Sequence, residues 1–321
     1  TCVIRGCVPK KLMVFASGYS EMFDDARAYG WDVTEGPFNW PRFRVQLHKE
    51  LDRLEGIYRK LLGGSNVEIF DARAALKDPH TVTLSTGQEV TAKHILVATG
   101  GRPVVPEMSG SELGITSNEV FLLDEMPKSI LIIGGGYIAS EFAGILNGLG
   151  VEVTQFYRGA QILRGFDDEA RGLVAEGMRA KGVDLHLGTN IVELRAATEA
   201  DLKGTTEGVP MEDGHPAAVP QKSAGKGIWV KATNGTEKVY DQVMFATGRA
   251  PNTDGIGLEE AGVTVGRRGE IVVDEFSQTN VPSVYAIGDV TNRVQLTPVA
   301  IREGMAFVET VFKGNPTAVD H

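Results

Sequence analysis

The sequence predicts an α/β fold built from two related strand–turn–helix units. The apolar segment 94–100 ends in Ala-Thr-Gly, and the segment 243–248 repeats both the apolar run and that ending. Between them, the apolar run 129–133 leads into three consecutive glycines and then a helical pattern. Short apolar runs that end in glycine turns before helices are typical of buried strands in α/β sheets.

The composition is that of an ordinary globular protein of two or three domains. The chain has 321 residues, of which 42% are hydrophobic and 23% charged. Its net charge of −10 argues against a general nucleic-acid or anionic-membrane partner. No apolar run approaches the ~18 residues of a membrane span. Two cysteines in 321 residues are typical of a protein from a reducing compartment. A cytoplasmic location is therefore expected, with an organelle such as a plastid as the alternative.

Three stretches are predicted to be helices. Residues 8–30 carry apolar side chains at spacings of three and four, and Pro9 stands just inside the start, where a missing amide costs nothing. The same periodicity predicts a second helix at about residues 40–62. A third helix is expected after Pro298.

Short apolar runs outside these stretches predict strands. They are residues 67–70, 81–84, 89–91, 94–98, 129–133, 243–246 and 284–287. The segment 196–227 is instead polar, rich in Gly, Thr and Glu, and interrupted by three prolines. We expect it to be a surface insertion.

Cys2 and Cys7 are the only cysteines, and four residues separate them. Closing so short a loop stabilises a fold by about 2 kcal/mol, against about 3 kcal/mol for a fifteen-residue loop. A pair that opens and closes during turnover therefore fits better than a structural staple, although the spacing differs from the commoner C-x-x-C motif. Two buried free thiols are the alternative. The two cysteines cannot supply the four ligands of a zinc site by themselves, and the nearest histidine along the chain is His48.

Gly134-x-Gly136-x-x-Ala139 stands where a dinucleotide fingerprint is expected, after a strand and at the start of a helix. Its glycines allow a tight turn and let the backbone approach a pyrophosphate, which rests on the helix N-terminus. An ordinary strand-to-helix turn is the alternative. The sequence therefore predicts a dinucleotide site here.

The residues after the next strand indicate which dinucleotide binds. An NAD-binding unit usually has an acid about 20 residues past the glycines, but here the segment has Arg158 and Arg164 and no acid. Charge-assisted bonds contribute roughly 1.5–3 kcal/mol each, so two arginines on a 2′-phosphate favour NADP. A pair of solvated surface arginines is the alternative.

A nicotinamide gives up a hydride, whereas a disulfide accepts two electrons through a thiolate, and flavin is the usual mediator between them. Two positions could contact a flavin. Gly288-Asp289 ends a buried strand and could bind a ribityl hydroxyl, and Lys10 could bring a positive charge near the ring and the thiolate.

With these residues assembled, the chain resembles the FAD-dependent pyridine nucleotide–disulfide oxidoreductases, in the branch that reduces glutathione disulfide. Thr-Cys-x-x-x-x-Cys-Val-Pro-Lys-Lys at residues 1–11 is the most specific motif, and its Ile4-Arg5 form is similar to that of bacterial and plant members. The segments that support the resemblance are residues 115–119, 163–167, 246–253, 285–290 and 296–300.

The resemblance implies two Rossmann-like dinucleotide-binding domains of the three-layer ββα type. Residues 1–101 would be part of an FAD-binding domain, 102–251 an NADPH-binding domain with the insertion, and 252–321 a central domain that completes the FAD site. The family's first glycine fingerprint is expected before Thr1, and its dimerisation domain after His321. We therefore expect a homodimer, and no turnover by the chain as given.

The resemblance also implies roles for individual residues. Cys2 would attack glutathione disulfide, and Cys7 would lie against the flavin. Lys10 and Glu141 would form an ion pair beside the ring, and Tyr137 would cover it until NADPH binds. The expected FAD contacts are Thr1, Lys10, Ala74, Thr99, Gly100, Asp289 and Thr297. The expected NADPH contacts are Gly134, Gly135, Gly136, Ile138, Ala139, Arg158, Arg164, Gly248 and Gln295.

Fewer residues indicate which disulfide is the substrate than indicate the redox chemistry. Tyr58 stands where the family has a tyrosine at the glutathione site, and a core position in its helix is the alternative. An arginine that contacts glutathione in some members aligns with Met305. A trypanothione reductase-like enzyme and a non-catalytic dinucleotide-binding scaffold are therefore the two rival interpretations. No metal ligand set is expected.

Overall fold

The computed structural model describes residues 2–204 and 227–321, which form two compact units. Unit 1 consists of Gly56–Pro103 and Arg249–His321, and unit 2 of Cys2–Glu55 and Val104–Gly248. Thr1 and most of the predicted insertion lie outside the described residues. By its contacts, the segment Cys2–Glu55 groups with unit 2 rather than with the following strands. The three-domain division remains a prediction.

A four-stranded parallel sheet forms the centre of unit 2, in the order β12-β6-β7-β8. The strands are β6 (Ser129–Ile133), β7 (Glu152–Tyr157), β8 (Asp184–Leu187) and β12 (Gln242–Phe245). Ile130, Leu131 and Ile132 of β6 are all fully buried, although their side chains alternate between the two faces. The continuous apolar run therefore reflects a sheet that is covered on both sides.

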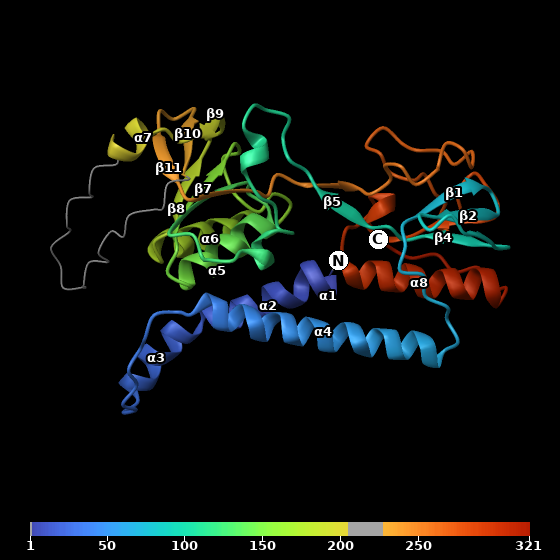
Figure 1. Ribbon diagram of the computed structural model, residues 1–321, viewed down its shortest axis with the longest axis horizontal. Helices are drawn as coiled ribbons and strands as arrows, with labels where there is room; N and C mark the ends of the chain where they lie inside the picture. The colour runs from blue at the N-terminus through green and yellow to red at the C-terminus, as the bar shows by residue number, and fades with distance from the viewer. Residues whose placement is uncertain (1, 205–226) are drawn as a thin grey trace. The chain divides into compact units, whose positions relative to one another are not determined.

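Unit 2 has three layers. On one face, α5 (Tyr137–Gly148) and α6 (Asp168–Ala180) pack on the sheet, and on the other lies an antiparallel sheet of β9 (Ile191–Ala196), β10 (Ile228–Ala232) and β11 (Glu237–Tyr240) (Figure 1). The short helix α7 (Glu199–Gly204) follows β9. This arrangement confirms the predicted α/β fold of the three-layer ββα type.

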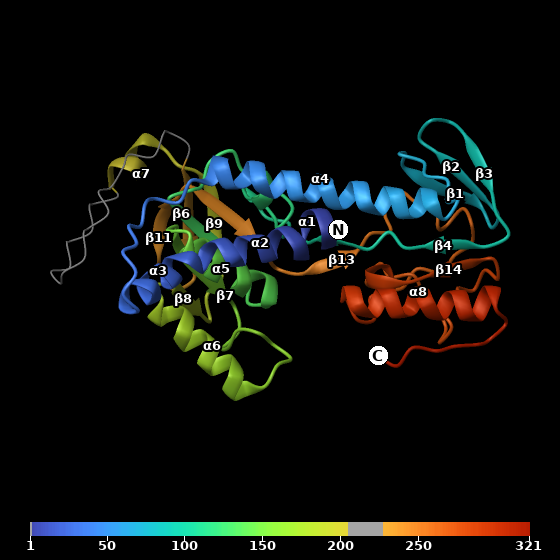
Figure 2. The same cartoon turned by 90° about the horizontal axis from the view of Figure 1, so that it is seen from below.

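The N-terminal helices differ from the prediction. Residues 8–30 form two helices, α2 (Cys7–Ser17) and α3 (Tyr19–Ala28), which meet at Gly18, while α1 (Cys2–Arg5) precedes them. Glycine is a poor helix former, and α2 ends there against α5 (Figure 2). Met13 is buried, whereas Phe15, Tyr19 and Met22, which belong to the apolar pattern of this segment, are 54%, 54% and 56% exposed. The second predicted helix is confirmed as α4 (Trp40–Gly64).

Unit 1 brings together strands that lie far apart in the sequence. The strand β4 (Ile95–Val97) pairs in parallel with β14 (Val284–Ala286). The strand β5 (Gly101–Pro103) pairs antiparallel with β13 (Arg249–Pro251). A separate antiparallel sheet consists of β1 (Ala74–Asp78), β2 (Thr81–Leu84) and β3 (Glu89–Thr91). The third predicted helix is confirmed as α8 (Thr297–Phe312), with Pro298 in its first turn.

The strand predicted at residues 67–70 is wrong. The segment has no regular structure, and its apolar side chains Val67, Ile69 and Phe70 are 47%, 39% and 37% exposed. Within the described part of the chain, no neighbouring strand pairs with it. A local apolar run is therefore not sufficient for a strand without a partner.

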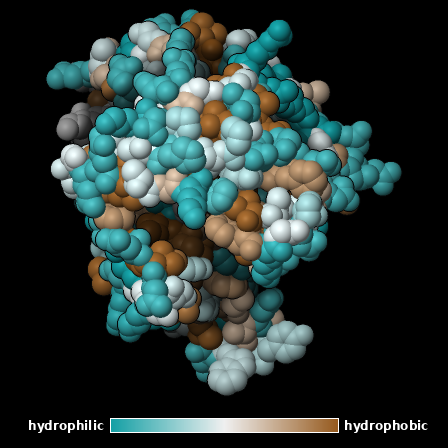
Figure 3. All heavy atoms as spheres, turned by 90° about the vertical axis from the view of Figure 1, so that its right-hand side faces the viewer, coloured by the Kyte–Doolittle hydropathy of each residue, from teal (hydrophilic) through white to brown (hydrophobic). Residues whose placement is uncertain are grey.

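Among the described residues, every helix is too short or too polar to cross a lipid bilayer. Hydrophilic side chains cover most of the face shown in Figure 3, and the hydrophobic side chains between them form separate patches.

Candidate active site

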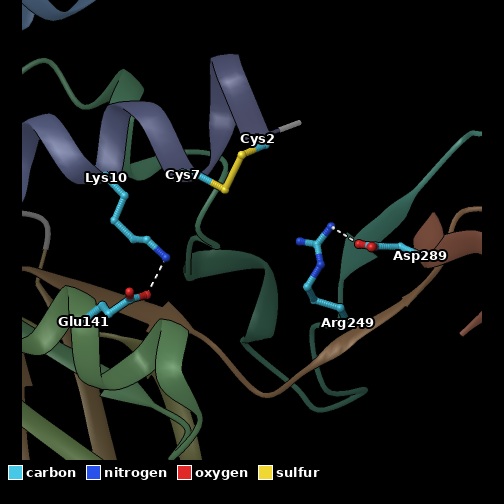
Figure 4. Close-up of a disulfide and its surroundings, with 6 residues drawn as sticks. All are labelled: Cys2, Cys7, Lys10, Glu141, Arg249 and Asp289. Carbon is cyan, nitrogen blue, oxygen red and sulfur yellow. Dashed lines mark hydrogen bonds and ion pairs between the residues drawn. A yellow bond between two sulfur atoms is a disulfide. The ribbon is translucent and has the colours of Figure 1, made fainter. Parts of the chain in front are cut away.

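The two cysteines form a disulfide between neighbouring helices of unit 2. Cys2 lies in α1, and Cys7 is the first residue of α2 (Figure 4). Cys7 is exposed and Cys2 is partly buried. Gly6 precedes α2 and has no side chain to cap its first amides. The positive end of the helix dipole therefore faces the cysteine sulfur and favours its thiolate after reduction.

A cation and a carboxylate lie one helical turn from Cys7. The Nζ atom of Lys10 donates to Oε2 of Glu141, on α5 (Figure 4). The Lys10 side chain is only 16% exposed. Its Nζ atom also lies 5.7 Å from the centre of the Tyr137 ring, a distance at which a cation is attracted to the ring. The structure thus brings together three predicted site residues from α2 and α5.

The glycine turn joins β6 to α5. A Cβ atom on Gly134, whose φ is +143°, would lie 2.2 Å from the carbonyl oxygen of Ala246, and one on Gly135 would lie 2.3 Å from the Tyr157 ring. A Cβ atom on Gly136, the N-cap residue of α5, would have no other atom within 4 Å. The first two glycines are therefore needed for packing, and the third leaves open space at the helix N-terminus.

Other predicted residues adjoin this turn. Ala139 is fully buried in α5 behind it, next to the partly buried Ile138. Gly248 follows β12, which is the parallel neighbour of β6. Because the carboxyl ends of parallel strands meet at one edge of a sheet, Gly248 lies at the same edge as the glycine turn.

Arg158 and Arg164 lie in the loop between β7 and α6. Both side chains are exposed, and neither has an ion-pair or hydrogen-bond partner within residues 2–204 and 227–321. The amide of Leu163 donates to the carbonyl oxygen of Gly135 at 2.6 Å. The loop that carries the arginines is therefore tied to the glycine turn.

Tyr157 was missed by the sequence reasoning. Its ring lies against both Gly135 and Gly159, where added Cβ atoms would come within 2.3 and 2.6 Å of it. The contact between Gly135 and the Tyr157 ring could not be predicted from the sequence, because the two residues are distant along the chain.

The candidate flavin residues of unit 1 follow its parallel strands. Thr99 and Gly100 come after β4, and Gly288 and Asp289 come after β14, so both pairs lie at one edge of the sheet. The Thr99 hydroxyl donates to the carbonyl oxygen of Asn252 at 2.8 Å. Gly100 and Gly288 have φ values of +72° and +75°, which glycine adopts without strain.

Arg249 is a second residue that the sequence reasoning missed. Its Nη2 atom donates to the carbonyl oxygen of Gly101 at 2.7 Å and lies 3.6 Å from Oδ2 of Asp289 (Figure 4). It therefore links the two strand ends. The signal was present in the sequence, since Arg249 directly follows the repeated Ala-Thr-Gly ending.

The remaining predicted site residues are more scattered. In unit 1, Ala74 begins β1, Thr297 begins α8, and Gln295 donates its side-chain amide to Oδ1 of Asn292. Tyr58 lies on α4 and is 51% exposed, which argues against the alternative of a core position. Thr1 lies outside the described residues. No cluster of three or more His, Cys, Asp or Glu side chains suited to a metal ion occurs in the described ranges.

Comparisons with known proteins agree with this arrangement. Residues 1–304 match the family described as pyridine nucleotide-disulphide oxidoreductase. The chain is 46% identical over 321 residues to a glutathione reductase of Burkholderia cepacia, covering 100% of this chain and 65% of that protein. It is 37% identical over 336 residues to a trypanothione reductase of Leishmania donovani, covering 100% of this chain and 63% of that one. The chain thus spans less than two thirds of the length of these relatives.

A solved structure shows the same fold. An HOCl-induced flavoprotein disulfide reductase from Escherichia coli superimposes with a TM-score of 0.81 and 22% sequence identity, covering 99% of this chain and 64% of that one. At this identity the likeness concerns the fold alone.

Proposed function

Because the chain belongs to the pyridine nucleotide-disulphide oxidoreductase family, we propose that the protein uses NADPH and FAD to reduce glutathione disulfide to glutathione. The observation that carries the proposal is the disulfide between its only two cysteines, at the N-terminus of a helix and one turn from the Lys10–Glu141 pair. The glutathione reductase relative supports this choice of substrate.

The residues of unit 1 fit one part of an FAD molecule. Thr99, Gly100, Gly288 and Asp289 lie at the carboxyl ends of two parallel strands, where α/β sheets bind ligands. The Asp289 carboxylate can accept hydroxyl hydrogen bonds, and Gly100 offers open space, since an added Cβ atom would meet nothing within 4 Å. Ala74, Thr297 and Thr1 are further proposed contacts. When bound, FAD would supply a two-electron relay between a reduced nicotinamide and the disulfide.

The residues of unit 2 fit the phosphates of NADPH. The open position at Gly136 leaves the first amides of α5 free to bind the pyrophosphate. Gly134, Gly135, Ile138 and Ala139 shape the turn beside it. Arg158 and Arg164 are exposed and unpaired among the described residues, so both are free to bind the 2′-phosphate. Gly248 and Gln295 are the further proposed NADPH contacts.

The thiols would carry the substrate half of the reaction. In the reduced protein, the Cys2 thiolate attacks one sulfur of glutathione disulfide, forms a mixed disulfide and releases one glutathione. The Cys7 thiolate then attacks the Cys2 sulfur and releases the second glutathione. The protein disulfide is restored, two electrons have passed to the substrate, and two protons complete the two thiols.

Charges near the disulfide would assist these steps. Lys10 and the first turn of α2 both stabilise a thiolate on Cys7, the thiolate that attacks the Cys2 sulfur in the second step. Glu141 holds the Lys10 ammonium in place, and Tyr137 lies against it. Tyr58, exposed on α4, is the proposed contact for glutathione.

The first rival is a trypanothione reductase-like specificity. The Leishmania relative is 37% identical to this chain. Met305, on α8, is 65% exposed, and it is the position where the family resemblance implies a glutathione-contacting arginine in some members. The second rival is a scaffold that binds dinucleotides and has no redox activity. Within the described residues, no structural observation favours the scaffold over the reduction of glutathione disulfide.

NADPH oxidation tests the proposal directly. The protein is expressed from its complete reading frame and assayed with glutathione disulfide and, separately, trypanothione disulfide. Rapid turnover with glutathione disulfide alone is expected. Turnover with trypanothione disulfide alone would assign the rival specificity, and bound FAD without turnover on either would leave the scaffold interpretation.

The oligomeric state and the cellular location of the protein belong to the same proposal. Homodimers are expected from the family resemblance, and sedimentation of the protein from its complete reading frame tests this. A cytoplasmic location is proposed from the low cysteine content of the chain.

A further inference from the structure

Arg171 is a nearly buried cation that the proposed chemistry does not use. It lies on α6, and its side chain is 14% exposed. Its Nε atom donates to the carbonyl oxygen of Ile162 at 2.7 Å, and its Nη2 atom donates to that of Gln161 at 3.1 Å. Its Nη1 atom pairs with the carboxylate of Asp168 at the start of α6. One planar guanidinium thus joins two consecutive loop carbonyls to the beginning of a helix.

These two carbonyls lie directly before Leu163 and Arg164. Leu163 has a φ of +56°, a left-handed conformation that costs energy in any residue other than glycine. Its amide donates to Gly135, and the preceding side chain, Ile162, is fully buried in the core. The segment is therefore fixed from the glycine turn on one side and from Arg171 on the other.

Such a conformation persists only where its surroundings hold it. The residue that follows it, Arg164, is exposed and has no partner among the described residues. A fixed backbone at Arg164 reduces the conformational entropy that the residue loses when its side chain binds an anion. The arrangement presents a free guanidinium from a rigid loop.

We propose that Arg171 is a positioning residue that determines how strongly the protein prefers NADP⁺ over NAD⁺. It acts by fixing the loop from which Arg164 reaches the 2′-phosphate, and this inference rests on the proposed NADPH site. Its own charge is paired with Asp168, and two of its donors are used by carbonyls. Arg171 therefore contributes through geometry rather than as a third cation for the phosphate.

Titration calorimetry on the oxidised protein, expressed from its complete reading frame, tests the inference with NADP⁺ and NAD⁺ as the two probes. In Arg171→Ala, the dissociation constant for NADP⁺ is expected to rise about tenfold, while that for NAD⁺ changes less than twofold. A residue with a purely structural role would weaken both dinucleotides alike or neither.

Two further variants separate geometry from charge. Arg171→Lys keeps the charge but cannot donate to two carbonyls in one plane, so it is expected to lose most of the preference as well. Arg179→Ala removes the same charge from the same helix, where Arg179 donates to the carbonyl oxygen of Leu185. This control is expected to leave the ratio of the two dissociation constants unchanged.

The possible outcomes are distinct. Equal affinity of the unaltered protein for the two dinucleotides would overturn the proposed NADPH site, and with it the role of Arg171. A clear preference that survives in Arg171→Ala, or is restored in Arg171→Lys, would overturn the role of Arg171 alone. If Arg171→Ala does not fold, Arg171→Lys decides, because its NAD⁺ affinity shows whether the site is intact.

Discussion

At the scale of single residues, Cys2 and Cys7 differ in their surroundings although they share one disulfide. Cys7 has the first turn of α2 and Lys10 nearby, whereas Cys2 belongs to the four-residue helix α1. A helix terminus and a cation both lower the free energy of a thiolate. Cys7 is therefore the thiol better suited to remain a thiolate while Cys2 reacts with substrate.

Replacing Cys2 by Ser tests this division of roles. The variant is expected to lose reduction of glutathione disulfide by at least about a hundredfold, because no thiol remains to form the mixed disulfide. Bleaching of the flavin absorbance by NADPH should persist and is measured by stopped flow. Loss of both steps together would contradict the separate role of Cys2.

Tyr240 is a residue for which burial dominates. Its side chain is 1% exposed, and burial raises the pKa of its phenol to about 12. The nearby Thr154 hydroxyl opposes this shift only in part, since neither hydroxyl has a partner in hydrogen-bond geometry. In the unfolded chain the phenol ionises near pH 10. Its contribution to stability is therefore complete below about pH 10 and is lost as the pH rises toward 12.

Tyr240→Phe is expected to remove this alkaline sensitivity. At pH 7 the variant should stay within about 1 kcal/mol of the unaltered protein, because the hydroxyl makes no hydrogen bond that could be lost. Between pH 10 and 12, the unaltered protein should lose about 1.4 kcal/mol per pH unit relative to the variant. Urea midpoints measured at each pH provide the comparison, and a constant difference across the range would contradict the prediction.

At the scale of elements, the contact between α2 and α5 depends on one glycine. A Cβ atom on Gly148 would lie 2.9 Å from Cβ of Ser17 and 3.0 Å from its carbonyl oxygen. The two helices can lie this close only because Gly148 has no side chain. The same contact brings Lys10 and Glu141 together.

Gly148→Ala should therefore destabilise the protein by about 1–3 kcal/mol through overpacking. Gly144→Ala is the matched control on the same helix, because a Cβ atom there would meet nothing within 4 Å. It should instead stabilise the helix by up to about 1 kcal/mol. Urea unfolding distinguishes the two, and equal shifts in both variants would show that helix propensity, rather than the contact with Ser17, determines the outcome.

The elements also show which features local sequence can predict. The glycine turn and α4 follow from short-range spacing, and the structure has both. The end of α2 at Gly18 was missed because the apolar periodicity continues beyond it. The left-handed Leu163 and the Arg249–Asp289 pair could not be predicted, because both depend on contacts with residues distant in the sequence.

At the scale of the whole molecule, unit 2 receives part of its core from the N-terminal segment. Met13 and Trp40 are 0% and 2% exposed and pack with α5 and β6. The parallel sheet, its covering helices and the antiparallel layer nevertheless all lie within Val104–Gly248. This segment contains every element needed for the glycine turn and the arginine loop.

Residues 104–248 expressed alone are therefore expected to fold and to bind NADP⁺ within about tenfold of the affinity of the whole protein. Loss of the buried surface of Met13 and Trp40 removes about 5 kcal/mol, which corresponds to a melting temperature lower by about 15 °C. Circular dichroism and calorimetry measure both quantities. A fragment without a cooperative transition would contradict the prediction.

The pairing of β4 with β14 also affects how the chain folds as it leaves the ribosome. β4 emerges early, but its partner follows roughly 190 residues later. At a synthesis rate of about 5–20 residues per second, the nascent strand waits on the order of 10–40 s. β12 completes the parallel sheet of unit 2 about 40 residues before β14 appears. Nascent chains should thus acquire a folded unit 2 while β4 still exposes an unpaired edge, which makes this interval the one in which chaperones protect the chain from aggregation.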